Sequence, residues 1–313
     1  MTEHRSTERH PFESLIILLL LIIAGVFIFS LLALGVNIVV YGFSPVLDMA
    51  SGKANGNINF LKIFQISTSI GMFIIPAMVF ARIERKNWLG YLKLNTEFPI
   101  LLIAITVLLM FASVPLLEYS VEVNKAMKLP EFLKGLEIWM KTKEDEMAKL
   151  TMQLLDMDSI SVLVINLFML AVIPAVGEEL IFRACLQKIL GKMTGNYHVA
   201  IWLAAIIFSA IHLQFYGFIP RMLLGALFGY LFFWSKSIWL PMLAHFVNNA
   251  AAVVTAYVYQ RKGISLENLE AGSPSPSYIY LISFVGTALL MWFFYKTALN
   301  SSSDKGIYGK GLE

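Results

Sequence analysis

Residues 159–190 read SISVLVINLFMLAVIPAVGEELIFRACLQKIL, an apolar run that carries Glu178, Glu179 and Arg183 in its second half. The run is long enough to cross a membrane, because a spanning helix needs about 20 apolar residues. A charged side chain deep in a bilayer costs at least about 2.5 kcal/mol, so such residues are candidates for function. The run therefore predicts a membrane helix that carries a polar site.

The composition of the whole chain agrees with a membrane protein. Of 313 residues, 58% are hydrophobic and 14% are charged, whereas soluble domains are about 25% charged. This balance excludes a soluble enzyme, and a net charge of +3 is too small to indicate a nucleic-acid-binding protein. The single cysteine, Cys185, excludes an intramolecular disulfide, a CxxC redox pair and a thiolate zinc site. We expect Cys185 to be an inert core residue.

Seven other apolar runs lie on either side of this one, so we predict an all-α polytopic membrane protein. It should have about eight transmembrane helices that enclose an intramembrane polar site, and residues 1–313 should form a single integral-membrane domain. The first run is about twice as long as the apolar part of a signal peptide and is expected to be a retained span. The predicted spans are 14–41, 58–81, 98–117, 159–190, 198–214, 218–234, 237–260 and 277–299.

Two polar segments interrupt or end this pattern. Residues 118–158 form a polar insertion whose centre has the spacing of an amphipathic helix, which lies either on the membrane surface or in solvent as a loop helix. Residues 300–313 form a polar tail. The apolar side chains of the expected helix are Phe132, Leu133, Leu136, Ile138 and Trp139.

Lysine and arginine residues predict the orientation in the membrane. With the N-terminus inside, the inner segments carry twelve of these cations and the short outer loops carry five, one of which is Arg221. The count leaves out the 118–158 insertion, because long loops cross the membrane largely regardless of charge. We expect a multi-pass protein of the cell (inner) membrane with both termini in the cytoplasm.

The remaining polar residues inside apolar sequence are His212 in the fifth run and His245, Asn248 and Asn249 in the seventh. Counted along helices from the same membrane face, Glu178, His212 and His245 lie at depths of roughly 18, 21 and 12 Å. Three polar side chains on three helices should therefore meet in one layer.

Spacing within each helix predicts which of these side chains pair with each other and which face a different part of the site. Glu179 and Arg183 are four residues apart with the acid first, which favours an ion pair. Glu178 points about 100° away from Glu179 and can face a different cavity. His245 and Asn249 share one helix face, from which an imidazole and an amide can donate to a developing oxyanion.

Proline and glycine residues indicate how the helices are shaped. Pro174 removes a backbone hydrogen bond one turn before Glu178, and Gly177 lets another helix approach, so we expect a kinked helix around a wet site. Gly225 and Gly229 form a GxxxG pattern that predicts close helix packing.

Three motifs resemble those of one family. Glu178–Arg183 matches EExxxR, Phe208–His212 matches FxxxH, and His245–Asn249 matches HxxxN. In this order on successive membrane helices they are similar to the motifs of the CAAX-protease and bacteriocin-processing (CPBP, or Abi) family. The resemblance covers residues 159–260, which we take as the catalytic core.

The resemblance implies an eight-helix intramembrane endopeptidase acting on membrane-embedded or lipidated substrates, such as prenylated CAAX tails. It implies that Glu178, helped by His212, activates a water, and that His245 and Asn249 stabilise the oxyanion. The residues agree, because a carboxylate removed from water is a stronger base. Glu179 and Arg183 are then a supporting structural pair.

Metal dependence has two interpretations. Glu178, His212 and His245 could bind zinc with an open fourth position. We predict no metal, because the three lie on separate helices and Asn249 suits an amide donor better than a zinc ligand. A zinc-bound histidine also needs a supporting carboxylate, and Glu179 is expected to be held by Arg183.

Absent motifs disfavour other intramembrane proteases, since the chain has no HExxH, GxSxG or GxGD. Two alternatives to a protease stay open. One is a non-proteolytic immunity or scaffold protein of the same fold. The other is a proton-coupled transporter that uses Glu178 and the histidines, although no inverted repeat is visible.

Overall fold

The computed structural model describes residues 9–51, 57–265 and 275–303, and within these ranges it contains helices and no strands. The predicted all-α class is therefore confirmed. The elements are α1 (Pro11–Tyr41), α2 (Ser44–Ala50), α3 (Ile58–Ser69), α4 (Ile75–Glu84), α5 (Trp88–Tyr91), α6 (Leu101–Ala126), α7 (Lys134–Leu154), α8 (Ile160–Leu167), α9 (Ile173–Glu179), α10 (Gln187–Thr194), α11 (Tyr197–Ala210), α12 (Phe218–Ser235), α13 (Trp239–Arg261) and α15 (Ser277–Ser303), with a 3₁₀ turn η2 (Glu131–Leu133) and π turns η1 (Ile70–Ile74), η3 (Phe168–Val172) and η4 (Leu180–Leu186).

Within the described ranges, six continuous helical segments are long and apolar enough to cross a membrane, so the chain is a multi-pass membrane protein. They are Pro11–Tyr41, Ile58–Glu84, Leu101–Ala126, Ile160–Thr194, Phe218–Ser235 and Ser277–Ser301. The other two predicted spans also form helices. The apolar α11 has only 14 residues, and α13 is 23 residues long but carries the polar residues of the third motif.

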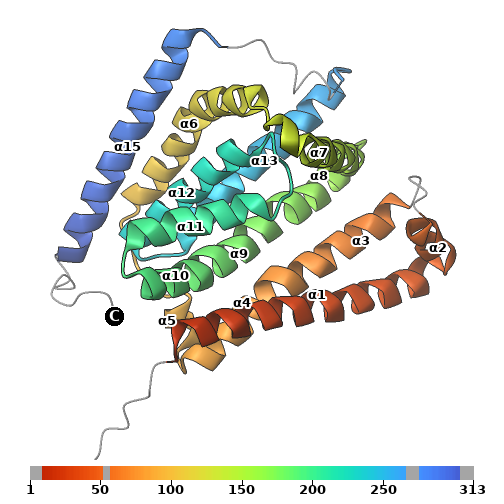
Figure 1. Ribbon diagram of the computed structural model, residues 1–313, viewed down its shortest axis with the longest axis horizontal. Helices are drawn as coiled ribbons and strands as arrows, with labels where there is room; N and C mark the ends of the chain where they lie inside the picture. Colours follow the sequence, from red (N-terminus) through yellow and green to blue (C-terminus); the bar gives the residue numbers. More distant parts are fainter. Residues whose placement is uncertain (1–8, 52–56, 266–274, 304–313) are drawn as a thin grey trace, which may run out of the picture.

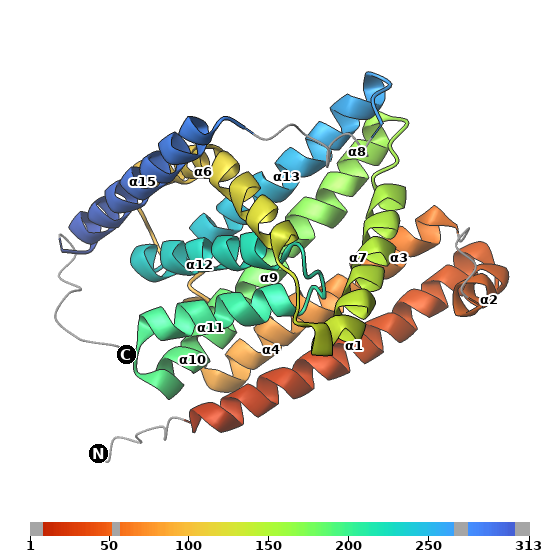
Figure 2. The same cartoon turned by 45° about the horizontal axis from the view of Figure 1, so that its top comes forward.

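The helices form a central group with one outer group on each of two sides (Figure 1). On one side α1 packs against α3 and α4, and on another side α6 packs against α15. Between them lie α9 to α13, in which α9 contacts α13 and α11 contacts α12. Figure 2 shows that this central group contains the elements on which all three motifs lie.

Glycine residues set the closest helix contacts. A Cβ added to Gly25 of α1 would lie 1.9 Å from the carbonyl oxygen of Gly71, so these backbones touch. On α12, a Cβ at Gly225 would lie 3.1 Å from that of Ala205, and one at Gly229 would lie 2.8 Å from Ile201. The close packing predicted from GxxxG is therefore confirmed, and its partner is α11.

The helices do not end where the apolar runs end, because a helix can continue into polar sequence. Helix α6 extends to Ala126, so the start of the 118–158 insertion is helical. Helix α15 continues to Ser303, beyond the predicted start of the 300–313 tail, and residues 304–313 lie outside the described ranges. In contrast, α11 ends at Ala210, before the predicted end of the 198–214 span.

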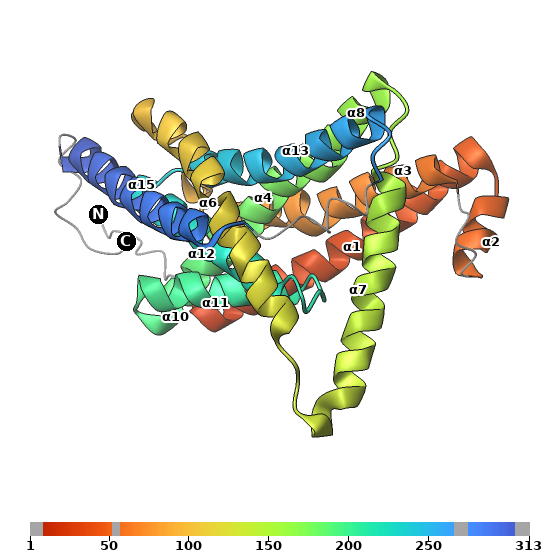
Figure 3. The same ribbon diagram turned by 90° about the horizontal axis from the view of Figure 1, so that it is seen from above.

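The helix expected in the insertion is α7, which lies at the periphery of the bundle (Figure 3). Leu154 is its one buried residue. Apolar side chains near its start are open to the surroundings, with Phe132 84% and Ile138 60% exposed. This exposure fits both environments predicted for it, the membrane surface and solvent.

Candidate active site

Glu178 and Glu179 lie on a short α-helical piece between two π turns. The helix from Ile160 to Thr194 is continuous, but η3 precedes α9 and η4 follows it directly after Glu179. Pro174 is the second residue of α9 and has no N–H to donate, which accounts for a disturbed backbone ladder at η3. π turns inside α-helices are frequent at functional sites. No residue pattern in the sequence predicted the second turn, η4.

Glu179 is the centre of the site and is fully buried. Its Oε2 lies 3.0 Å from Nε of Arg183, which is the ion pair expected from their spacing. Its Oε1 lies 2.9 Å from Nδ1 of His245. Arg183 therefore holds one oxygen of Glu179 as expected, and the other oxygen contacts a histidine that the sequence analysis did not pair with it. This carboxylate also orients His245, so the argument from a missing supporting carboxylate no longer disfavours zinc.

Glu178 lies beside the other nitrogen of the same histidine. Its Oε2 is 3.8 Å from Nε2 of His245, and the two residues are 9% and 5% exposed. Since Nδ1 of His245 is engaged by Glu179, Nε2 is the nitrogen that faces the space next to Glu178. The structure thus brings Glu178, Glu179, Arg183 and His245 together from η4, α9 and α13.

His212 was predicted to lie within a membrane helix. The structure places it in the loop after α11, which ends at Ala210. Its Nδ1 is 2.8 Å from the carbonyl oxygen of Phe208. The Phe208 ring lies 5.1 Å from the His212 ring and 6.2 Å from the His245 ring, centroid to centroid. His212 therefore approaches the site next to Phe208, with its Nε2 free of this backbone contact.

Asn249 is held on both sides of its amide. Nδ2 donates to the carbonyl oxygen of Leu170 at 3.0 Å, and Oδ1 accepts from Asn248 at 3.1 Å. An amide nitrogen carries two hydrogens, so one N–H remains for a ligand. Asn248 thus orients Asn249.

Among the residues that the structure describes, no group of three His, Cys, Asp or Glu side chains is arranged to hold a metal ion. Glu178, His212 and His245, the ligands of the zinc alternative, therefore do not form a preassembled metal site. Cys185 is fully buried, as predicted.

Arg221 is the site residue that the sequence analysis missed. It was counted with the outer loops, but its charge interacts with Glu178 and with His212. A signal was present in the sequence. Arg221 is the fourth residue of the sixth apolar run and follows His212 by only nine residues, so both should lie at the same end of adjacent helices.

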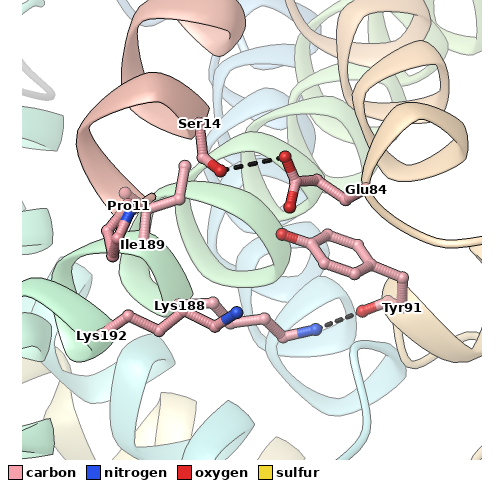
Figure 4. Close-up of a pocket in the computed structure, with 7 residues that line it drawn as sticks. All are labelled: Pro11, Ser14, Glu84, Tyr91, Lys188, Ile189 and Lys192. Atoms are coloured by element: carbon pink, nitrogen blue, oxygen red, sulfur yellow. Dashed lines mark hydrogen bonds between the residues drawn. The ribbon is translucent and has the colours of Figure 1, made fainter. Parts of the chain in front are cut away.

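A separate small cavity is lined by side chains of α1, α4, α5 and α10 (Figure 4). Its polar lining includes Glu84, which accepts from Ser14 at 2.9 Å, and Lys188, which donates to the carbonyl oxygen of Tyr91. Burial raises the pKa of the Tyr91 hydroxyl. The cavity of about 40 Å³ has room for about one water and contains none of the predicted site residues.

Fold and site together define a polytopic α-helical membrane protein with a buried glutamate–histidine site. Residues 160–251 match the family model described as type II CAAX prenyl endopeptidase Rce1-like. This part of the chain is thus an Rce1-like domain of the CPBP family, which confirms the family predicted from the motifs. The match supports a protease-like function, and all three motifs lie within it.

A second comparison finds a bacterial relative. The chain is 29% identical over 89 residues to the uncharacterized protein YpbD of Bacillus subtilis (strain 168). The aligned part is 27% of this chain and 42% of the relative, so the chain spans less than half of that protein. No solved structure matches the chain.

Proposed function

We propose that the protein is an intramembrane endopeptidase that hydrolyses membrane-associated substrates of the lipidated, CAAX type with a water activated by Glu178. The observation that carries this proposal is the buried Glu178 carboxylate, 3.8 Å from Nε2 of a histidine whose other nitrogen is held by Glu179. A carboxylate beside an oriented N–H donor suits general-base hydrolysis.

The reaction follows from these positions. Glu178, assisted by His212, takes a proton from water while the water oxygen attacks the peptide carbonyl carbon. The carbonyl oxygen becomes an oxyanion, which accepts hydrogen bonds from Nε2–H of His245 and from the remaining N–H of Asn249. Glu178 then gives its proton to the leaving nitrogen as the C–N bond breaks. The products are a carboxylate and an amine.

The charges of the site favour this assignment. Arg183 places a positive charge beside Glu179, and the two nitrogens of His245 face Glu179 and Glu178. A buried carboxylate without such partners would be an uncompensated charge in the membrane. Nε2 of His245 is also the nitrogen from which an oxyanion beside Glu178 would accept a hydrogen bond.

Substitution of Glu178 tests the proposal. Glu178→Gln keeps size and hydrogen bonding but removes the base, so purified protein should lose about 10²- to 10⁴-fold in turnover of a farnesylated peptide. Glu131→Gln, at a highly exposed glutamate, is the matched control and should be fully active. Near-normal hydrolysis by Glu178→Gln would overturn the assignment.

The same assay separates the alternatives. Wild-type protein should stay active after chelator treatment, whereas activity that disappears and returns with zinc would establish the zinc site at Glu178, His212 and His245. A scaffold or immunity protein would keep its cellular phenotype with Glu178→Gln.

A further inference from the structure

Three lysines from three different parts of the fold lie close enough to repel one another. Lys93 follows α5, Lys188 lies on α10, and Lys236 directly follows α12. The charges of Lys93 and Lys236 both act on Lys188, and the charge of Lys93 acts on Lys236. Each ammonium group is therefore within electrostatic range of the other two.

Side-chain contacts of Lys188 connect the segments that carry the other two lysines. Lys188 donates to the carbonyl oxygen of Tyr91 (Figure 4), and its Nζ lies 4.6 Å from the centroid of the Tyr91 ring and 5.5 Å from that of the Phe232 ring. Tyr91 is two residues before Lys93, and Phe232 is one helical turn before Lys236. Lys188 thus lies between the two turns that carry Lys93 and Lys236.

Those two turns are also joined directly. The amide of Ile238 donates to the carbonyl oxygen of Lys93 at 3.3 Å, and the indole N–H of Trp239 donates to the carbonyl oxygen of Leu94 at 2.9 Å. These hydrogen bonds hold the segment after α5 against the start of α13. The lysines are therefore carried by segments with fixed relative positions.

Lys93 and Lys236 have a backbone conformation that is uncommon for lysine. Their φ angles are 58° and 57°, and Leu213 is the one other non-glycine residue of the described ranges with a positive φ. Asparagine and aspartate are the side chains enriched in this region. Such outliers persist where the surrounding structure requires them, and they gather at ligand sites. The turn geometry alone does not account for lysine at either position.

The cluster of three lysines has no carboxylate partner among the described residues. None of the ion pairs there includes Lys93, Lys188 or Lys236. Glu84 lines the same small cavity as Lys188, but it accepts a hydrogen bond from Ser14. Lys236 is exposed and the other two lysines are half-buried. An anion from outside the protein can therefore reach the cluster.

The surroundings select the kind of anion. Trp239, next to the cluster, is 48% exposed, and tryptophan is enriched at the level of the lipid headgroups. All three lysines belong to the segments predicted to face the cytoplasm. Basic pockets between membrane helices on that side bind anionic lipid headgroups. The usual excess of cations inside does not require lysines to gather around one half-buried ammonium group.

We propose that Lys93, Lys188 and Lys236 bind the phosphate of an anionic phospholipid headgroup. The bound headgroup offsets the repulsion among the three ammonium groups and links the segment after α5, α10 and the α12–α13 turn. Helix α10 continues the helix that carries the EExxxR motif, and α13 carries His245. The lipid therefore stabilises the frame of the candidate site. This inference does not depend on proteolytic activity.

Thermal unfolding of the purified full chain in dodecyl maltoside tests the proposal. Added dioleoylphosphatidylglycerol should raise the unfolding temperature by about 3–6 °C, as expected for a ligand that binds only the folded protein. Dioleoylphosphatidylcholine, whose headgroup has no net charge, should leave it nearly unchanged, as should inorganic phosphate at matched ionic strength. Equal rises with the two lipids, or a rise with inorganic phosphate equal to that with phosphatidylglycerol, would overturn the proposal.

Three substitutions locate the site. Lys93→Asn and Lys236→Asn introduce a residue that favours positive φ, and Lys188→Met keeps an unbranched chain against the two rings. Each should weaken binding of phosphatidylglycerol, measured by native mass spectrometry, about fivefold. Lys296→Gln, at an exposed lysine of α15, removes the same charge elsewhere and should bind the lipid as the wild type does. Equal weakening by Lys296→Gln would overturn the site.

Stability without lipid distinguishes ligand binding from a structural role. Because the lysines repel one another, each cluster variant should unfold in lipid-free detergent at the same temperature as the wild type or at a higher one. It should also gain less from phosphatidylglycerol. Variants that are less stable without lipid but gain as much as the wild type would overturn the site. If Lys188→Met does not fold, the two asparagine variants decide.

Discussion

At the scale of single residues, Glu179 performs two tasks with one carboxylate. It neutralises Arg183, which also donates to the Gly225 carbonyl oxygen at 3.0 Å, and it orients His245. Removing one partner of a buried pair leaves an unpaired charge, whereas replacing both by apolar residues is often neutral. The two tasks of Glu179 can therefore be separated.

Glu179→Leu should lower the free energy of unfolding by about 3–5 kcal/mol, because Arg183 is left unpaired. The double variant Glu179→Leu/Arg183→Met should recover most of this stability. It should remain nearly inactive, since Nδ1 of His245 has lost its acceptor. Thermal unfolding and peptide hydrolysis measure the two effects. Recovery of both stability and activity in the double variant would mean that Glu179 only balances Arg183.

The sequence predicted local residue contacts better than distant ones. The Glu179–Arg183 pair follows from helix geometry alone, since residues four apart share a face. The contact between Glu179 and His245 joins positions 66 apart and depends on how α9 and α13 are rotated, which packing decides. His212 was placed in a helix because the sequence there stays apolar, yet the backbone leaves the helix at Ala210.

At the scale of elements, α1 shows how closely two membrane helices can approach. Gly25 touches the backbone at Gly71, whereas Gly35, ten residues further along the same helix, has no atom within 4 Å of an added Cβ. Small residues allow such approaches in membranes. The two glycines thus form a natural pair of test and control positions.

Gly25→Ala should destabilise the protein by about 1–3 kcal/mol, the usual cost of forcing extra atoms into a packed contact. Gly35→Ala should be neutral or slightly stabilising, because alanine favours helix more than glycine does. Thermal unfolding in detergent compares them. Equal effects of the two substitutions would show that α1 is not held at Gly25.

Helix positions were predictable because every span needs apolar residues, and all eight predicted runs form helices. Helix ends were less predictable. Hydropathy indicates which residues lie in the membrane, but it does not indicate where the backbone stops being helical. Helix α6 extends past the apolar run to Ala126, where its backbone hydrogen bonds continue through polar residues. Of the π turns, η1 and η3 each precede a helix whose second residue is a proline, Pro76 and Pro174, whereas η4 had no distinct sequence signal.

At the scale of the whole molecule, the distribution of positive charge predicts which end of the bundle faces the cytoplasm. The α10–α11 turn and the α13–α15 connection should lie on opposite faces. Met193 is 46% exposed at the first, and Lys262 is exposed at the second. Because Cys185 is the single cysteine and is buried, a Cys185→Ser background is free of thiols.

In intact spheroplasts, a membrane-impermeant maleimide should label Lys262→Cys in this background. Met193→Cys should react only after permeabilisation, as expected for a cytoplasmic turn. Labelling in the reverse order would place both termini outside and invert the predicted topology.

The shared carboxylate of Glu179 also limits how this protein can be engineered. A library selected for heat resistance alone would tolerate apolar replacement of Glu179 and Arg183 together, because replacing both partners of a buried ion pair is often neutral. Those same replacements would release His245 from its acceptor. Directed evolution of a robust variant must therefore screen for turnover in every round, since at these two positions a protein can keep its stability and still lose catalysis.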